Sequence, residues 1–512
     1  MKQLKTMCLS LLLCTALCAC AGKAETKEST GNETGSISET AKPAETLPTE
    51  DAKTGISKEE IEIHETLESS ADGEHVITAD NETKSVSNTA VNKTGDSEGD
   101  EADFYGENAA IFAANGAALD LSELVITTAG THANAVFSYG EGTVVTIKDS
   151  VIETTGNCSG GIMTTGGGTM HAENLMIHTT GNSSAAIRSD RGGGTVIVTG
   201  GSYTTEGKGS PAIYSTAEIT VNDAELVSTA SQGVVVEGKN SVTLNNVNLT
   251  ADNNTKNSDK SDYYQAVMIY QSMSGDAAVG KSYFAMNGGT LTNQNGDIFF
   301  VNNTVTEITL NQAVIVNQDA DGVFLRAAAA GWGKEGSNGG QVTLNASAQE
   351  ITGDVLADSV SAVNLILKDG SVFTGAVNPN GQEGEVYVEL DESSKWVLTA
   401  DSWITSLTCT SGSIDLNGHT LYVNGTAYDG GASQGEAIEQ TVSEEEGRME
   451  GGPDMGGMKP EGTMTGEPPA KPDGENGGEP PAKPEGNMTG EPPAKPDGKP
   501  GEKPSSDSGT KQ

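Results

Sequence analysis

The chain has 512 residues, a formal net charge of −43 and only 4% aromatic residues. Binding to nucleic acid needs clustered Lys and Arg, so this charge excludes nucleic acid as a partner. Such an excess of acidic residues is typical of a secreted protein, because electrostatic repulsion between molecules keeps it soluble.

The N-terminus has the form of an export signal. Lys2 and Lys5 precede an apolar run at 7–16 that is too short to cross a bilayer. The next residues, LCAC at 17–20, resemble the bacterial lipobox, whose last cysteine is acylated after cleavage. This resemblance implies a lipoprotein signal peptide at 1–19 and a lipid on Cys20, which would anchor the exported chain to the outer face of the bacterial cell membrane. The alternative is ordinary cleavage near Ala19, which leaves Cys20 as a free thiol.

Only Cys158 and Cys409 lie beyond this leader, far apart in the sequence. An exported chain with this pattern is not a disulfide scaffold, and it has no zinc-binding or redox spacing. We therefore expect a hydrophobic core to hold the fold, without a metal or cofactor.

Low-complexity segments flank the central part of the chain. Residues 20–69 are mostly Glu, Thr, Lys and Ser after the lipidated cysteine, which predicts a disordered tether. Residues 431–512 are acidic and then rich in Pro and Gly, with GEPPAKP at 466, 478 and 490. Such segments favour polyproline II and cannot bury a core. We interpret the second segment as a solvated tail; a wall-spanning spacer and an epitope are the alternatives.

Residues 70–430 carry an internal repeat, clearest in VIETTGNCSGGI (151–162) and MIHTTGNSSAAI (176–187). Aligned units give three apolar columns, mostly 22–26 residues apart, within segments such as TVIVT that alternate apolar and polar residues. A period of two predicts strands with one buried face. The columns are Ile111, Val136, Ile162, Ile187, Ile213, Val235, Val267, Phe299, Phe324; Leu121, Ile147, Ala172, Val198, Val221, Leu244, Met286, Leu310, Leu344; and Ile126, Ile152, Ile177, Tyr203, Leu226, Leu249, Leu291, Ile315.

Three strands per repeat predict an all-β solenoid, because stacked coils bury the faces that one coil leaves exposed. A column of asparagines supports this register, since corner amides can hydrogen-bond along a stack. A β-sandwich would not hold one spacing through so many units. The asparagines are Asn222, Asn245, Asn287, Asn311 and Asn345.

Several segments resemble known β-helical proteins. They include NKTGDSEGDEADFYGENAAIFA (92–113), VFSYGEGTVVTI (136–147), AAIRSDRGGGTV (185–196), VMIYQSMSGDA (267–277) and KWVLTADSWITSLTCTSGSIDLNGHTLYVNG (395–425). The chain resembles the right-handed parallel β-helix of pectate lyases and autotransporter passengers, and more closely the adhesin-like surface proteins of Gram-positive gut anaerobes. The resemblance covers roughly 70–430 and implies that fold and a surface-binding role.

The outward-facing column decides between catalysis and binding. In polysaccharide lyases of the resembled fold, such residues supply carboxylates for calcium and a base. This column has one arginine and no acid, which argues against an enzyme because paired carboxylates are missing. Its aromatic and Met side chains suit stacking on sugar rings or a protein partner, and truncating them is expected to leave folding nearly unchanged. The column is Phe137, Met163, Arg188, Tyr214, Val236 and Met268.

A turn ledge beside this column, SYGEG (138–142) and SDRGGG (189–194), adds Tyr139, Glu141, Asp190 and Arg191. Guanidinium groups suit the recognition of carboxylates. The alternative is that Arg188 and Arg191 only pair with Asp190 and Glu141.

Two insertions, 251–265 with two tyrosines and 331–340 with Trp332, are either recognition loops or tolerated insertions. The segment NQDADG (317–322) predicts a turn. A calcium loop at Asn317, Asp319 and Asp321 is the alternative, although Ala328 stands where its glutamate is expected. The histidines His75, His132, His171 and His178 share no coil position with a cysteine or an acid cluster and are interpreted as surface residues.

These observations together favour a lipid-anchored adhesin or binding protein for glycans or surface proteins. A carbohydrate-active enzyme and a passive structural rod are the alternatives.

Replacing Cys20 with Ser should release the protein into the medium, because the acylated cysteine is its expected anchor. Cys18→Ser is the matched control and should leave the protein on the cells. Immunoblots of cell and medium fractions measure both, and retention of the Cys20→Ser variant would contradict lipidation.

Overall fold

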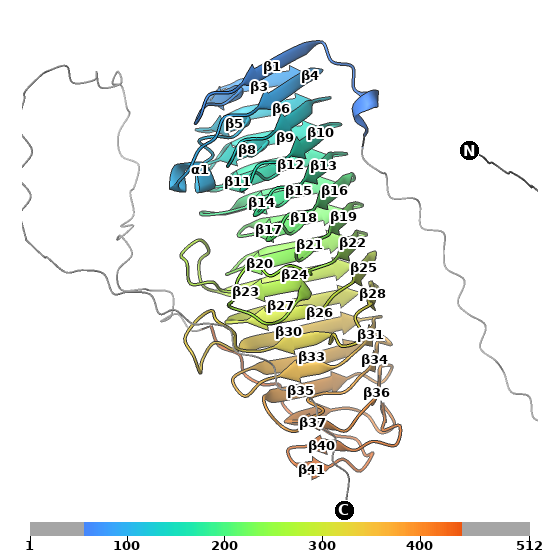
Figure 1. Ribbon diagram of the computed structural model, residues 1–512. Coiled ribbons are helices and arrows are strands. Elements are labelled where there is room, and N and C mark those ends of the chain that lie inside the picture. Colours follow the sequence, from blue (N-terminus) through green and yellow to red (C-terminus); the bar gives the residue numbers. More distant parts are fainter. Residues whose placement is uncertain (1–55, 443–512) are drawn as a thin grey trace, which may run out of the picture. The chain divides into compact units, whose positions relative to one another are not determined.

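The computed structural model describes residues 56–442. Here the chain winds into a column of stacked coils, and each coil adds strands to parallel sheets (Figure 1). Three long sheets, A, B and C, contain 10, 11 and 13 strands. Through most of the column every third strand joins the same sheet, which defines a parallel β-helix. The predicted all-β solenoid with three strands per coil is therefore confirmed. Cys20, the signal peptide and the GEPPAKP repeats lie outside the described residues.

The strands of each long sheet follow one another in chain order. Sheet A contains β1 (Glu65–Ser69), β4 (Thr89–Lys93), β7 (Val125–Thr128), β10 (Val151–Thr154), β13 (Met176–Thr179), β16 (Ser202–Thr205), β19 (Glu225–Ser228), β22 (Asn248–Ala251), β25 (Thr290–Asn293) and β28 (Val314–Asn317). Sheet B contains β2 (Ile77–Asp80), β5 (Ile111–Ala114), β8 (Val136–Tyr139), β11 (Ile162–Thr165), β14 (Ile187–Ser189), β17 (Ile213–Ser215), β20 (Val234–Glu237), β23 (Gln265–Tyr270), β26 (Asp297–Asn302), β29 (Leu325–Ala327) and β32 (Val355–Ala357). Sheet C contains β3 (Thr83–Ser87), β6 (Ala118–Ser122), β9 (Val144–Lys148), β12 (Gly168–Glu173), β15 (Gly194–Thr199), β18 (Glu218–Asn222), β21 (Ser241–Asn245), β24 (Lys281–Asn287), β27 (Thr304–Asn311), β30 (Gly340–Ser347), β33 (Ala362–Lys368), β35 (Glu385–Leu390) and β38 (Ser406–Thr408).

Shorter elements complete the two ends of the column. A 3₁₀ turn, η1 (Lys58–Glu60), precedes β1, and a short helix, α1 (Asp100–Phe104), lies between β4 and β5. Two small sheets form the C-terminal end, where β41 pairs antiparallel with β40. This hairpin helps to cover the last edge of the stack, which would otherwise be open to other chains. The small sheets contain β31 (Glu350–Thr352), β34 (Val372–Thr374), β36 (Lys395–Val397) and β39 (Ile414–Asp415); and β37 (Ser402–Ile404), β40 (Leu421–Val423) and β41 (Thr426–Ala427).

The predicted apolar columns point into one continuous core. The third column is confirmed from Ile126 to Ile315, each member opposite the next in sheet A. The second column is confirmed up to Leu310, but Leu310 lies opposite Ala346. The predicted Leu344 is therefore wrong by two residues, a slip that keeps the same face of the strand.

The first column is confirmed except at two positions. Val234 lies opposite Ile213, so Val235 points outward and Val236 points into the core. The predictions for Val235 and Val236 are therefore wrong, because three successive valines carry no polar residue that marks the faces. Phe324 packs in the core, but Leu325 is the residue opposite Phe299.

The asparagine ladder forms over part of its predicted length. The side-chain amides of Asn245 and Asn287 each donate to the Oδ1 of the preceding asparagine, at 2.9 Å. Asn345 instead lies opposite Thr309, so its place in the column is wrong. The ladder satisfies successive corner amides and fixes the register of these coils.

The TTGN sequences form the same corner of consecutive coils. The hydroxyls of Thr154 and Thr179 each donate, at 2.6 Å, to a serine carbonyl five residues later. A Cβ on Gly156 would lie 1.9 Å from the carbonyl oxygen of Gly130, and one on Gly181 would lie 1.8 Å from that of Gly156. Only glycine fits at this corner.

A C-terminal strap, residues 435–442, runs back along the outward face of sheet C. Three backbone amides of the strap donate hydrogen bonds to side chains of sheet C. The amide of Gly435 donates to Thr408 at 3.1 Å, that of Ile438 to Asn364 at 2.9 Å, and that of Thr441 to Gln341 at 3.1 Å. These partners belong to β38, β33 and β30, so the strap crosses several coils. Among the described residues, none of the helices has the length and apolar character needed to cross a membrane.

We expect Gly156→Ala to lower the free energy of unfolding by about 1–3 kcal/mol, because the new Cβ would overlap a carbonyl oxygen. Gly116→Asn is the control, since Gly116 has open space around it and a φ of 79° that asparagine tolerates. Denaturant unfolding followed by circular dichroism measures both. Parental stability in Gly156→Ala would show that the corner has room for a side chain.

Candidate functional site

The outward column of sheet B is not the open ladder expected from the sequence. Phe137 and Met163 are fully buried in a cluster with Ala109, which the chain segment after α1 brings onto the sheet. Gly106 makes this approach possible: it has a φ of 78°, and a Cβ there would lie 2.9 Å from the ring of Phe137. Both residues are therefore core residues of a covered surface, not an exposed binding face. The partly buried Tyr139 packs against the same cluster.

From Arg188 onward the outward face of sheet B is the floor of a groove. Three adjoining cavities, of about 300, 110 and 170 Å³, follow the coils. Tyr214 and Tyr270 line both the first and the second cavity, and Tyr263 lines both the second and the third. From β14 to β32 the floor spans six strand spacings, or roughly 29 Å. We call it the aromatic groove, and its floor residues are Arg188, Tyr214, Val235, Met268, Phe300, Arg326 and Leu356.

A buried ion pair lies at one end of the groove. The Nη2 of Arg188 donates to Asp190 at 2.9 Å and lies 3.3 Å from Asp103 of α1. The predicted pairing of Arg188 with Asp190 is confirmed. Burial raises the pKa of Asp190 to about 6, although Arg188 acts in the opposite direction. Asp190 lines the first of the three groove cavities, so this cavity contains a carboxyl group with a raised pKa.

Arg191 joins α1 to the loop after β23. Its Nε donates to Asp276 at 2.8 Å, its Nη1 donates to Asp100 at 3.0 Å, and its guanidinium lies 3.6 Å from the centroid of the Phe104 ring. These partners replace Glu141, which the sequence suggested and which is exposed. They lie more than 80 residues away from Arg191, so local spacing held no signal for them.

Glu237 is a buried acid that the sequence reasoning missed. It is 1% exposed and accepts hydrogen bonds from the hydroxyls of Tyr214, Tyr270 (3.0 Å) and Ser272. The true register of the valine run places Glu237 opposite Tyr270, two positions after the outward Val235. With the correct register for the valine run, the sequence would have placed Glu237 on the outward face of sheet B.

The two insertions supply aromatic side chains to the groove. Trp332 meets Tyr270 edge to face, with ring centroids 5.2 Å apart. Tyr263 lies 5.4 Å from the ring of Phe300, and its ring faces the guanidinium of Arg326 at 4.3 Å. Arg326 is fixed by Asp297, whose Oδ2 accepts from its Nε at 2.6 Å. Of the predicted binding residues, the structure thus brings Arg188, Asp190, Tyr214, Met268 and Trp332 to this groove; Arg191 supports its wall.

The segment 317–322 forms a turn in which side-chain oxygens bind backbone amides. Asp319 accepts from the amides of Gly296 (2.7 Å) and Asp321 (2.9 Å), which lowers the pKa of Asp319. Asn317 Oδ1 accepts from the amide of Asp319 at 3.2 Å. These bonds give the side chains of Asp319 and Asn317 a structural role in the turn.

The interpretation of the histidines as surface residues is wrong for two of them. His75 is stacked on Phe112, with ring centroids 4.5 Å apart, and burial is the main cause that lowers its pKa. His132 lies beside Cys158 and Asp103. It stands at the same corner as Cys158, one coil earlier, so the expectation that no histidine shares a coil position with a cysteine is also wrong. His178 pairs with Glu206 at 2.9 Å on the surface.

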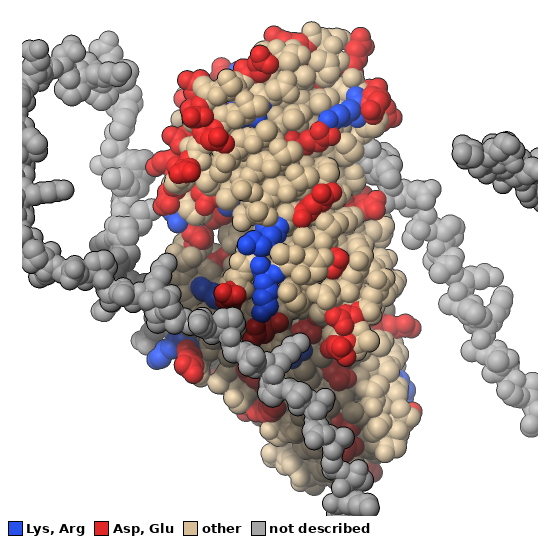
Figure 2. Space-filling model, in the orientation of Figure 1, with Lys and Arg blue, Asp and Glu red and all other residues tan. Residues whose placement is uncertain are grey.

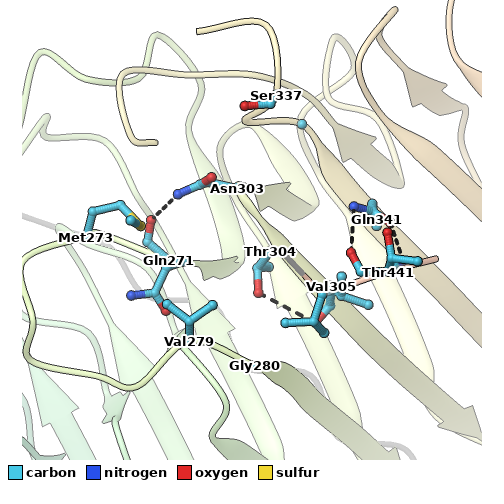
Figure 3. Close-up of a pocket in the computed structure, with 12 residues that line it drawn as sticks. Gln271, Met273, Val279, Gly280, Asn303, Thr304, Val305, Ser337, Gln341 and Thr441 are labelled. Atoms are coloured by element: carbon cyan, nitrogen blue, oxygen red, sulfur yellow. Dashed lines mark hydrogen bonds between the residues drawn. The ribbon is translucent and has the colours of Figure 1, made fainter. Parts of the chain in front are cut away.

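A separate pocket of about 50 Å³ lies where the strap ends (Figure 3). Gln271, Thr304, Gln341 and Thr441 line it, and Asn303 donates to the carbonyl of Gln271 at 2.9 Å. It is much smaller than the groove cavities, so the aromatic groove is the candidate site.

Comparison with protein-family models, curated proteins and solved structures finds no match to this chain.

Tyr214→Phe and Tyr270→Phe should each lower the free energy of unfolding by about 1–3 kcal/mol, because each removes a donor from the buried Glu237. This reverses the expectation that trimming Tyr214 leaves folding unchanged. Tyr283→Phe, at a residue that is 47% exposed, is the matched control. Denaturant unfolding measures all three, and parental stability of both groove variants would contradict the network.

Proposed function

We propose that this chain is a surface glycan-binding protein that holds an oligosaccharide along the aromatic groove. The observation that carries this proposal is the row of adjoining cavities with Tyr214, Tyr263, Tyr270 and Trp332 in their walls. Aromatic rings offer apolar faces for sugar rings, and their polar edges can hydrogen-bond to hydroxyls.

The polar lining supports a sugar more than an apolar ligand. Around the second cavity, Gln232, Asn253, Asn257 and Ser261 accompany the tyrosines. Amide and hydroxyl side chains both donate and accept hydrogen bonds, as a polyol ligand requires. A long groove of mixed aromatic and amide residues matches an extended chain of hydroxylated rings.

Charge favours a neutral glycan over a polyanion. The whole chain carries −43, and the groove arginines Arg188 and Arg326 are already paired with Asp190 and Asp297. On the face shown in Figure 2, Asp and Glu side chains are spread over the edges and the lower part, and a short row of Lys and Arg side chains lies near the middle. The negative charge of the protein would repel an acidic polysaccharide.

The proposal places the protein at the cell surface as a lipid-anchored adhesin. Its support is the lipobox-like LCAC at 17–20 and the resemblance of 70–430 to adhesin-like surface proteins. A rigid column on such an anchor would hold the groove away from the membrane.

Glycan cleavage is a second candidate, favoured by one observation. Asp190, with a pKa of about 6, and Glu237 both contribute carboxyl groups near Tyr214. A carboxyl group with a raised pKa is suited to act as a general acid.

Two other functions stay as alternatives. A surface protein could occupy the groove as its ligand, whereas a passive rod would bind nothing there.

A glycan array with the purified protein tests the proposal, followed by calorimetry with the best oligosaccharide. Trp332→Ala and Tyr263→Ala should each weaken binding by about 1–3 kcal/mol, because each removes a stacking surface from the groove. Tyr283→Ala, on the outward face of sheet C, is the matched control and should bind as the parent does.

Parental affinity in both groove variants would contradict the groove as the site. Absence of binding to every glycan would favour the passive rod or a protein ligand. Release of reducing ends from the bound oligosaccharide would favour the enzyme.

A further inference from the structure

Three side chains of different chemistry meet beside the first cavity of the groove. Asp103 of α1, His132 and Cys158 each direct one ligand atom to the others, all within 4.8 Å of one another. They come from three separate segments, so the fold assembles the cluster. Each side chain is partly buried, which limits competition from bulk water.

The stacking of coils brings the histidine and the cysteine together. His132 and Cys158 occupy the same corner of successive coils, with φ values of 56° and 54°. The amide of His132 donates to the carbonyl of Asn157 at 2.9 Å, and that of Cys158 to Asn182 at 2.8 Å. The matching backbone aligns the two side chains.

The second nitrogen of the histidine is already engaged. His132 Nδ1 lies 2.8 Å from the carbonyl oxygen of Ser97, which can only accept, so Nδ1 carries the proton. That bond turns the ring so that Nε2 faces Asp103, whose Oδ1 is 3.7 Å away. A backbone carbonyl that holds the distal ring nitrogen is the usual support of a metal-binding histidine.

We propose that Asp103, His132 and Cys158 form a binding site for a zinc ion. Thiolate, imidazole and carboxylate are the zinc ligands of proteins, and tetrahedral zinc places them about 3.3–3.7 Å apart. The observed separations need only small side-chain rotations to reach these values. Asp103 Oδ1 faces His132 and also lies 3.3 Å from the Nη2 of Arg188, and a carboxylate oxygen has lone pairs for both a metal ion and the arginine.

Three protein ligands leave one coordination position open. Asp103 and Cys158 line the first cavity, whereas His132 does not, so the open position faces the groove. The ion would there accept an oxygen of a groove ligand or a water molecule. The zinc site is independent of the proposed glycan specificity, because it is defined by the protein's own ligands.

Titration with Co²⁺ tests the zinc site. The sample is the full protein, purified from the cells that export it, with its thiols kept reduced. We expect one Co²⁺ per chain with a near-ultraviolet thiolate-to-cobalt band that Zn²⁺ displaces. Cys158→Ser should abolish the band, and His132→Ala and Asp103→Asn should weaken binding at least about tenfold.

Cys409→Ser and His178→Ala are the matched controls and should bind as the parent does. Circular dichroism checks that each variant is folded. The thiolate-to-cobalt band separates this site from weak binding by the many exposed carboxylates, which do not give such a band. Absence of the band in the parent, or its persistence in Cys158→Ser, would overturn the proposal. Loss of glycan binding in a variant that keeps the band would leave the zinc site standing.

Discussion

Parallel backbone ladders hold consecutive coils one strand spacing apart, and this separation sets the geometry of the whole column. It leaves no room for a Cβ where Gly156 faces the carbonyl oxygen of Gly130. That separation aligns every equivalent side chain with its neighbour in the next coil. The asparagine ladder, the buried hydroxyl bonds of Thr154 and Thr179, and the pairing of His132 with Cys158 all follow from it.

A regular stack by itself offers a flat face, and the insertions convert that face into a groove. The segment around α1 covers Phe137 and Met163 and ends the groove on that side. The insertions that carry Tyr263 and Trp332 add walls over the later coils. The floor is rigid because parallel ladders hold it, so a ligand would find its contacts already in place. The position of the groove therefore depends on where the repeat is interrupted.

Much of the fold follows from the repeat, because a fixed spacing and an alternating pattern report coil geometry directly. The prediction assigned the wrong faces at Val234–Val236, because no polar residue separates the inward from the outward positions there. The same error hid the outward position of Glu237. The separation of His132 and Cys158 equals one repeat, so their contact was readable from the same alignment. The approach of Asp103, and the burial of Phe137 beneath its segment, depend on how an insertion folds over a sheet, for which periodicity carries no information.

The strap gives the column a mechanical polarity. Its amides are bound one after another to Thr408, Asn364 and Gln341, and these partners lie on β38, β33 and β30, in order from the C-terminal end towards the middle. A pull on the chain beyond residue 442 first loads the hydrogen bonds that Gln440 and Thr441 make with β30, and only then those at Asn364 and Thr408. We therefore expect the strap to peel from sheet C from this end, before load reaches the ladders between coils.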